Sequence, residues 1–142
     1  MATLTVTEDQ LRLIQQALDF YSRIGIGQFG EIKNHPTFEK HLHIEFEIDD
    51  KTDYSRYHAV RDSVDNMLVQ PRNMLYNNNS LSRNGSWGIF NPNVDDSCRE
   101  AFDLIQVIRH EFWKKNPKRS SITVDSSLHL HCKDSDKIKV EL

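Results

Sequence analysis

Residues 21–29 read YSRIGIGQF and follow a stretch whose apolar side chains recur at helical spacing, namely Leu11, Ile14, Leu18 and Tyr21. Two glycines, Gly25 and Gly27, then interrupt this pattern, and each costs roughly 1 kcal/mol relative to alanine inside a helix. A G-x-G pair that follows a helix, rather than joining a strand to a helix, is the wrong context for a dinucleotide-binding loop. The remaining interpretations are a helix C-cap with a left-handed glycine and a close approach of another element. We expect an interrupted or kinked helix whose bare glycine surface lets a partner element pack closely.

The helix before these glycines has a clear start. Thr7–Gln10 has the form of a capping box, in which a threonine and a glutamine satisfy each other's backbone N–H groups. Val6 and Leu11 stand at the positions of a hydrophobic staple around that cap. We therefore expect the first helix to begin near Thr7.

Residues 33–53 have a different pattern, because Leu42, Ile44, Phe46 and Ile48 alternate with polar residues. This period of two predicts a half-exposed strand, although a helix stays open for residues 40–48 because Glu and Leu favour helices. A second helix is indicated by Val60, Val64, Met67 and Leu68, and we expect Pro71 to end or kink it.

Residues 77–97 form a predicted long loop that is rich in asparagine and also carries aromatic residues. A second capping box, Ser97–Glu100, opens a third helix, whose apolar face consists of Ala101, Leu104, Ile105, Ile108 and Phe112. The last part alternates over SITVD and SLHLHCK and returns as KIKVEL, which predicts an antiparallel meander. The expected fold class is therefore α+β: a single domain over 1–142 with three main helices packed on a small antiparallel sheet.

The composition limits the classes of function. A net charge of −3 argues against a general DNA-binding protein, so an anionic ligand would need a local group of arginines. No apolar run approaches the length of a membrane span, and the first residues lack the features of a signal peptide. We expect a cytoplasmic protein in which Cys98 and Cys132 stay reduced.

Metal-dependent and nucleophilic chemistry are both weakly indicated. Five side chains offer metal-ligand chemistry, namely His41, His43, His129, His131 and Cys132, but neither C-x-x-C nor H-E-x-x-H occurs. No G-x-S-x-G elbow is present, and acidic pairs such as Asp95 and Asp96 stand where helix capping explains them. We expect no metal, no other cofactor and no catalytic residue.

The long loop and the third helix offer groups for ligand binding. Trp87 and Phe90 supply stacking faces, Asn91 supplies an amide, and Arg99 and Arg109 supply phosphate-binding forks. Arg109 falls at the border of the apolar face of its helix, where its stem can be buried while its fork reaches a ligand. Solvated arginines and loop aromatics that merely cover the core are an equally good interpretation of this spacing.

Two segments, YSRIGIGQF and GSWGIFNPNVDDSCREAFDLIQVIRHEFW, resemble the first-described Thoeris anti-defence family of phage proteins. The resemblance covers about half of the chain and implies a cytoplasmic sponge. Such a protein sequesters cyclic ADP-ribose isomers without degrading them. Some members also hold cyclic oligonucleotides in a second site and assemble as hexamers built from dimers. The matching segments carry over Arg23, Phe90, Asn91 and Arg109 as ligand contacts.

On this resemblance the glycines would serve a close helix contact between subunits, and the chain is expected to be a homo-oligomer, either a dimer or a hexamer. Two other functions stay open. One is a metal-dependent phosphodiesterase that cleaves the same signals, and the other is a structural or regulatory phage protein without a small ligand.

Overall fold

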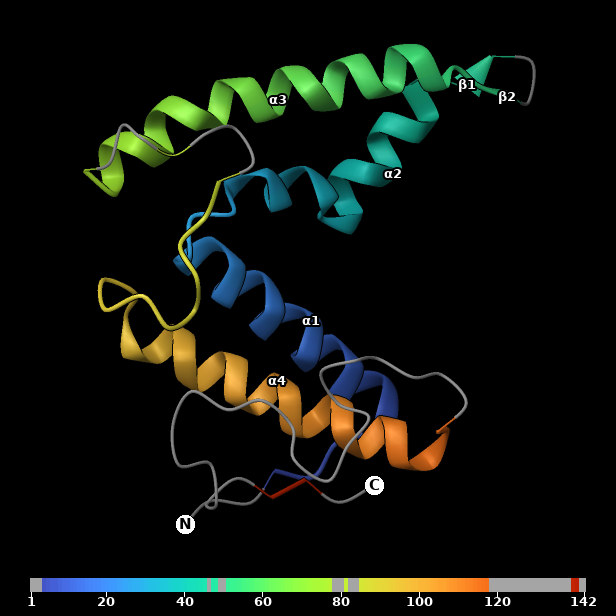
Figure 1. Cartoon of the computed structure of the whole chain (residues 1–142). Coiled ribbons are helices and arrows are strands. Elements are labelled where there is room, and N and C mark those ends of the chain that lie inside the picture. Colours follow the sequence, from blue (N-terminus) through green and yellow to red (C-terminus); the bar gives the residue numbers. More distant parts are fainter. Residues whose placement is uncertain are drawn as a thin grey trace. The chain divides into compact units, whose positions relative to one another are not determined.

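The computed structural model describes residues 4–45, 47–48, 51–77, 81, 85–117 and 139–140. Contacts within the chain group it into two compact units, which are coloured along the sequence in Figure 1. Unit 1 comprises Met1–Ile26 with Trp87–Leu142, and unit 2 comprises Gly27–Ser86. The single domain expected over 1–142 stays a prediction, and each unit is described by itself.

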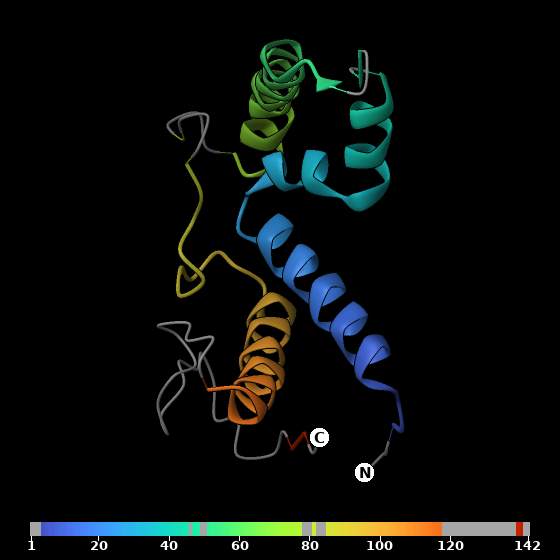
Figure 2. The ribbon, with the colours of Figure 1, turned by 90° about the vertical axis from the view of Figure 1, so that its right-hand side faces the viewer.

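Unit 1 is built on two helices, α1 (Glu8–Gly25) and α4 (Asp96–Lys115). They lie side by side in both Figure 1 and Figure 2 and pack along their lengths. The pair is antiparallel, because Lys115 at the end of α4 pairs with Glu8 at the start of α1. The core lies between and around them and consists of Leu11, Val94, Cys98, Ala101, Ile105, Val107 and Ile108.

The start of α1 agrees with the expected capping box. The Thr7 hydroxyl accepts a hydrogen bond from the Gln10 backbone N–H at 3.2 Å, and the Gln10 side chain accepts one from the Thr7 N–H at 2.9 Å. Glu8 in the first turn also favours the positive end of the helix dipole. A hydrogen bond from the Lys115 ammonium lowers the pKa of the Glu8 carboxyl. The capping box thus starts α1 at the position that the sequence predicts, and the Glu8–Lys115 pair ties this end of α1 to α4.

The end of α1 confirms the expected interruption at the glycines. The helix stops at Gly25 with Ile26 as its cap, and Gly27 has a φ of 87°, which favours glycine. Helical structure resumes as a 3-10 helix, η1 (Phe29–Asn34). The close packing is also confirmed, because a Cβ at position 25 would stand 3.1 Å from the Cβ of Cys98. The element that packs closely on Gly25 is therefore α4 of the same chain.

The start of α4 differs from the expected capping box at Ser97. Its N-cap is Asp95, which has an extended backbone (φ −62°, ψ 145°) and accepts a hydrogen bond from the Ser97 N–H at 2.9 Å. The Ser97 hydroxyl is instead 2.7 Å from the Tyr21 hydroxyl of α1. The helix therefore begins earlier than predicted, since Asp95 is as good a cap as serine and the Ser97 hydroxyl faces α1.

Unit 2 contains η1, α2 (Pro36–Glu45), α3 (Tyr54–Leu75) and two short strands, β1 (Glu47–Ile48) and β2 (Lys51–Thr52). The strands pair antiparallel, with Glu47 opposite Thr52 and Ile48 opposite Lys51. η1 packs against both α3 and α2. The buried side chains of α3 are Tyr57, Asp65 and Arg72, so two of its three most buried positions are charged.

The expected α+β class is wrong, because the described part of the protein is mostly helical. Residues 36–45, which include most of the predicted strand, form α2, so the helical alternative holds there. Pro36 fits the first position of a helix, and Glu39 accepts a hydrogen bond from Tyr57 of α3 at 3.1 Å. The predicted C-terminal meander lies outside the described residues, apart from 139–140, which are neither helix nor strand.

Pro71 does not end α3, which runs on to Leu75. The helix beyond the proline is held by Arg72, whose side chain is buried and donates hydrogen bonds to the backbone oxygens of Leu81 (2.8 Å) and Gly85 (2.9 Å). Tertiary hydrogen bonds thus help to offset the cost of the missing proline N–H. No helix among the described residues is both long and apolar enough to cross a membrane.

Candidate functional site

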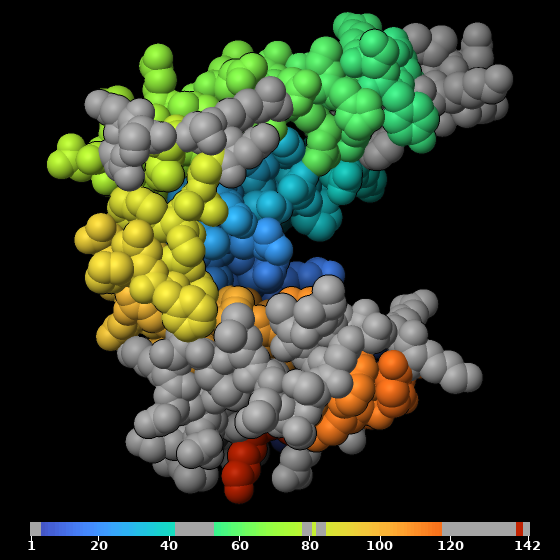
Figure 3. All heavy atoms as spheres, viewed as in Figure 1, coloured from blue at the N-terminus to red at the C-terminus, as the bar shows by residue number. Residues whose placement is uncertain are grey.

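The segment 85–95, which precedes α4, carries three of the six residues singled out for ligand binding, and it lies at the surface as the yellow to orange spheres of Figure 3. Two tight turns shape it, with hydrogen bonds from the Asn91 N–H to the Gly88 carbonyl at 2.8 Å and from the Val94 N–H to the Asn91 carbonyl at 3.0 Å. Val94 is 3% exposed and anchors the end of the segment in the core. We call residues 85–95 the aromatic loop.

Arg99 fastens this loop to α4. Its guanidinium donates to the backbone oxygens of Ile89 (3.3 Å) and Asn91 (2.7 Å) and pairs with the Asp96 carboxylate at 2.5 Å. Three of its five N–H groups are therefore used within the protein. These contacts make Arg99 a clamp on the loop, and its predicted phosphate contact stays a prediction.

Phe90 projects from the fastened loop. Its side chain is 58% exposed, whereas Trp87 at the start of the loop is half-buried. The Trp87 N–H donates to the Ile26 carbonyl at 2.9 Å and so ties the loop to the end of α1. The Asn91 Oδ1 accepts from the Asn93 N–H at 2.9 Å, so a ligand contact of this side chain would use its Nδ2 donors. The loop thus presents one aromatic face and one amide in a defined conformation.

The two other predicted arginines lie at different levels of the helix pair. Arg23 occupies the last turn of α1, near the point where Trp87 is attached, and its Nε is 2.6 Å from the Asp19 carboxylate. Arg109 is half-buried and lies ten residues after Arg99 on α4, a rise of about 15 Å. The fold therefore brings Arg23, Trp87, Asn91 and Arg99 to one end of unit 1 and places Arg109 away from it.

Cys98 lies in the first turn of α4, just after the loop, and has the properties of a core residue. It is 5% exposed, and its burial raises the pKa of its thiol. A protonated, enclosed thiol is a poor nucleophile, because the thiolate is the reactive form. Hydrogen bonds from Ser97 lower the pKa of the neighbouring Asp95, which therefore stays ionised as the cap of α4.

The two histidines of the H-x-H pair lie on a helix and not on the predicted strand. Positions 41 and 43 belong to α2, and two helical positions that are two residues apart do not share a face. The H-x-H pair would have shared a face only on a strand. His129, His131 and Cys132 lie outside the described residues, and no group of three metal-ligating side chains occurs within the part of the chain that is described.

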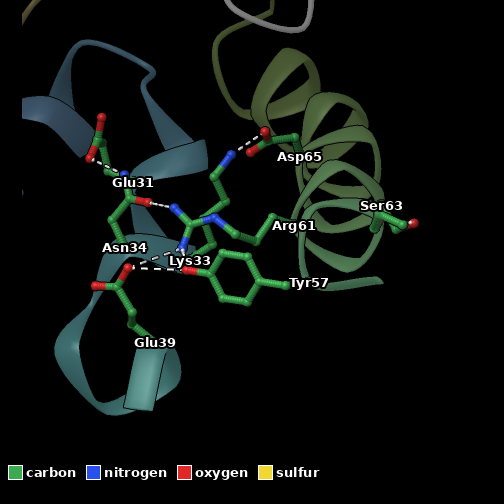
Figure 4. Close-up of polar contacts among 9 residues, drawn as sticks. Glu31, Lys33, Asn34, Glu39, Tyr57, Arg61, Ser63 and Asp65 are labelled. Carbon is green, nitrogen blue, oxygen red and sulfur yellow. Dashed lines mark hydrogen bonds and ion pairs between the residues drawn. The ribbon is translucent and has the colours of Figure 1, made fainter. Parts of the chain in front are cut away.

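Sequence reasoning missed a polar cluster in unit 2, which Figure 4 shows between η1, α2 and α3. The Lys33 ammonium pairs with the Asp65 carboxylate, and both side chains are largely buried. Beside them Arg61 donates to the Tyr57 hydroxyl at 2.8 Å and to Glu39 at 3.4 Å. Each cation faces an acidic or hydroxyl partner, so the cluster joins η1, α2 and α3. No sequence motif indicates this cluster, because its residues are far apart in the sequence.

Comparisons with known proteins found no relative of this chain. A scan against protein-family models found no match, and searches of curated proteins and of solved structures also returned no significant match. Any functional conclusion must therefore come from the residues themselves.

Proposed function

We propose that this protein binds and sequesters cyclic nucleotide immune signals, cyclic ADP-ribose isomers above all, without degrading them. In this proposal it acts as a phage anti-defence sponge in the host cytoplasm. The observation that supports it is an exposed aromatic ring on a fastened loop: Phe90 is 58% exposed while Arg99 and Val94 hold the backbone on either side. Binding residues are disproportionately found on loops that a rigid scaffold positions.

The chemistry of the aromatic loop suits a nucleotide base. Stacking of a base on an aromatic ring contributes about 1–3 kcal/mol, and it needs one accessible ring face. Phe90 offers that face, and the adjacent Asn91 retains amide donors that can bind an acceptor on the base edge or on a ribose. A loop that is already ordered loses little conformational entropy when the ligand binds.

The phosphates of such a ligand would meet Arg23, because Arg99 is engaged with the loop backbone. Arg23 lies near the attachment point of Trp87, and its side chain is 41% exposed. Its ion pair with Asp19 is a partly exposed pair of adjacent helical turns, a type that contributes little stability and can exchange for a phosphate contact. Arg109, which is about 15 Å away along α4, is a separate predicted contact.

The groups described beside the loop support sequestration rather than cleavage. Among the described residues the cysteine near the loop is Cys98, a buried thiol with a raised pKa, and the Asp95 carboxylate caps a helix. Neither is placed to transfer a proton to a ligand on Phe90 or to attack it. The bound signal would therefore leave unchanged when the protein unfolds.

A capture-and-release experiment tests the proposal. Protein is incubated with a cyclic ADP-ribose isomer, the unbound fraction is measured, and the protein is then denatured by heat. A sponge depletes the ligand and returns it intact, a phosphodiesterase returns a cleaved product, and a structural protein never depletes it. Cleaved product or absence of depletion would contradict the proposal.

Two variants make this experiment specific for the aromatic loop. Phe90→Ala should abolish most of the depletion, whereas Phe38→Ala should retain it. Phe38 is a suitable control because it is also an exposed phenylalanine, at 50%, but lies on α2. Equal loss of binding in both variants would show that the loop is not the ligand contact.

A further inference from the structure

The C-terminal half of α3 carries an apolar stripe that the proposed function does not use. Met67, Met74 and Leu75 are 73%, 79% and 75% exposed, although large apolar side chains normally contribute to a core. Pro71 lies between them and is also exposed. Figure 1 shows this part of α3 in light green and yellow-green, at the end of the helix remote from β1 and β2.

The stripe has the spacing of a helix–helix seam. Apolar residues recur in steps of three and four from Tyr57 to Met74, at positions 57, 60, 64, 67, 71 and 74. The first of these is buried in unit 2, the next two are half-buried, and the last three are exposed. The seam is therefore covered at its start and continues uncovered to the end of the helix.

The flanks of the exposed stripe carry no charge. Between residues 66 and 77 the only charged side chain is Arg72, which is 3% exposed and turned to the backbone of Leu81 and Gly85. Charged residues make up 27% of the whole chain, so about three would be expected in a run of this length. The exposed polar groups beside the stripe are Ser63 and Gln70.

We infer that this stripe is the contact between two copies of the chain, with α3 packed antiparallel on α3 of a second copy about a twofold axis. The seam then pairs Met67 with Pro71 of the partner subunit, and Val64 with Met74 of the partner subunit. On the two sides of the seam, Ser63 faces Gln70 of the partner subunit and Leu68 faces Leu75 of the partner subunit. These four contacts are all apolar or neutral, and the charged Arg61 and Asp62 lie next to Ser63 at the outer end of the seam.

A second copy fits this face better than an unrelated partner for two physical reasons. A twofold contact places each residue against the same surface of the other subunit, so any charge near the axis would meet its own sign. The stripe avoids that repulsion even though the chain has a net charge of −3. Amide and hydroxyl groups also both donate and accept hydrogen bonds, so Ser63 and Gln70 are complementary to themselves. The inference concerns unit 2 and does not depend on the proposed ligand.

The experiment is a charge exchange across the predicted contact, read by sedimentation velocity over a range of protein concentrations. One variant carries Ser63→Lys with Gln70→Lys, and the other carries Ser63→Glu with Gln70→Glu. Both positions are exposed, so folding should be unaffected, and circular dichroism checks this. Wild type should be dimeric or a higher multiple of dimers. Each variant alone should dissociate, with the dissociation constant raised at least about tenfold by like charges, and a one-to-one mixture should reassociate.

A control variant changes the same helix away from the stripe. Ser55→Lys with Asn66→Lys adds the same charge at exposed positions that are more than about 120° around α3 from the seam, and it should associate as wild type does. Monomeric wild type would overturn the inference, as would charge variants that associate normally. Variants that dissociate but do not reassociate when mixed would also overturn it, because antiparallel pairing requires residue 63 to face residue 70 of the second copy.

Discussion

Gly25 of α1 and Cys98 of α4 approach so closely that no side chain fits between them: a Cβ on residue 25 would overlap the Cys98 Sγ and stand 3.1 Å from its Cβ. This contact sets the separation of the two helices of unit 1 at the end where the aromatic loop is attached. It also gives the glycine a partner within its own chain. Close pairing of glycines between subunits, which the family resemblance implied, is therefore not needed to explain Gly25.

The first prediction follows from this contact. Gly25→Ala should lower the free energy of unfolding by about 1–3 kcal/mol, because an added methyl group overpacks a site that has no room. Removing the sulfur in the double variant Gly25→Ala with Cys98→Ala should recover part of the loss. Urea denaturation followed by circular dichroism measures both effects. Additive costs in the double variant would mean that the two residues do not compete for the same space.

The second prediction separates the clamp from the stacking face. Arg99→Ala should weaken binding of a cyclic ADP-ribose isomer about tenfold and should speed hydrogen exchange at the Asn91 and Val94 amides, because the loop loses its hydrogen bonds to the guanidinium. Phe90→Ala should weaken binding without changing those exchange rates. Titration calorimetry and exchange mass spectrometry provide the two measurements. Unchanged exchange in Arg99→Ala would show that the clamp does not order the loop.

The third prediction concerns Arg109. If it contacts a ligand phosphate, Arg109→Ala should cost about 1.5–3 kcal/mol of binding free energy, or about ten- to a hundredfold in affinity. Arg109→Lys should recover only part, since an ammonium group does not reproduce the bidentate guanidinium contact. Calorimetric titration of a cyclic ADP-ribose isomer into wild type and both variants measures these affinities. Wild-type affinity in a folded Arg109→Ala protein would remove this residue from the site, and the 15 Å separation along α4 would then explain why.

The fourth prediction uses the titration of Cys98, whose pKa is raised by burial. Above the ordinary pKa of a thiol, the unfolded chain loses this proton first, so the unfolded state binds fewer protons than the folded state. Stability should therefore fall as the pH rises from that ordinary value through the raised one. The decline should be smaller in Cys98→Ala, and urea denaturation at several alkaline pH values measures it. Equal slopes in both proteins would exclude Cys98 as the source.

Reactivity provides an independent check of the same burial. Iodoacetamide should modify Cys98 in the folded protein far more slowly than in urea, as measured by the mass of its peptide. Rapid modification of the native protein would contradict the enclosed position of the thiol.

The fifth prediction addresses the buried Lys33–Asp65 pair of unit 2. Lys33→Ala should destabilise the protein by about 3 kcal/mol, because it removes the ammonium partner of a buried carboxylate. The double variant Lys33→Met with Asp65→Leu should regain most of that loss, since apolar side chains of similar size often replace a buried ion pair without cost. As a comparison, Arg23→Ala removes the more exposed ion pair between Arg23 and Asp19. It should lower the free energy of unfolding by less than about 1 kcal/mol. Thermal denaturation compares the three, and equal losses would show that burial does not strengthen the pair.

The sequence alone determined the features that depend on neighbouring residues. The capping box at Thr7 and the interruption of α1 at Gly25 and Gly27 were correctly predicted, because caps and glycine costs act within a few residues. The loop before α4 was predicted for the same reason. The two loop residues on which the proposed binding rests, Phe90 and Asn91, were also singled out from the sequence.

Only the tertiary structure decided the features that depend on distant contacts. Residues 40–48 were left open between a strand and a helix, and the structure has the helix α2 over 36–45, which contacts α3 through Glu39 and Tyr57. Arg99 has the same local sequence whether it binds a phosphate or a carbonyl, and its role as a clamp emerged only when Ile89 and Asn91 were placed beside it. Long side chains with several donors take their partners from whatever the fold brings near. Periodicity and spacing report only the local backbone, so they could not reveal those partners.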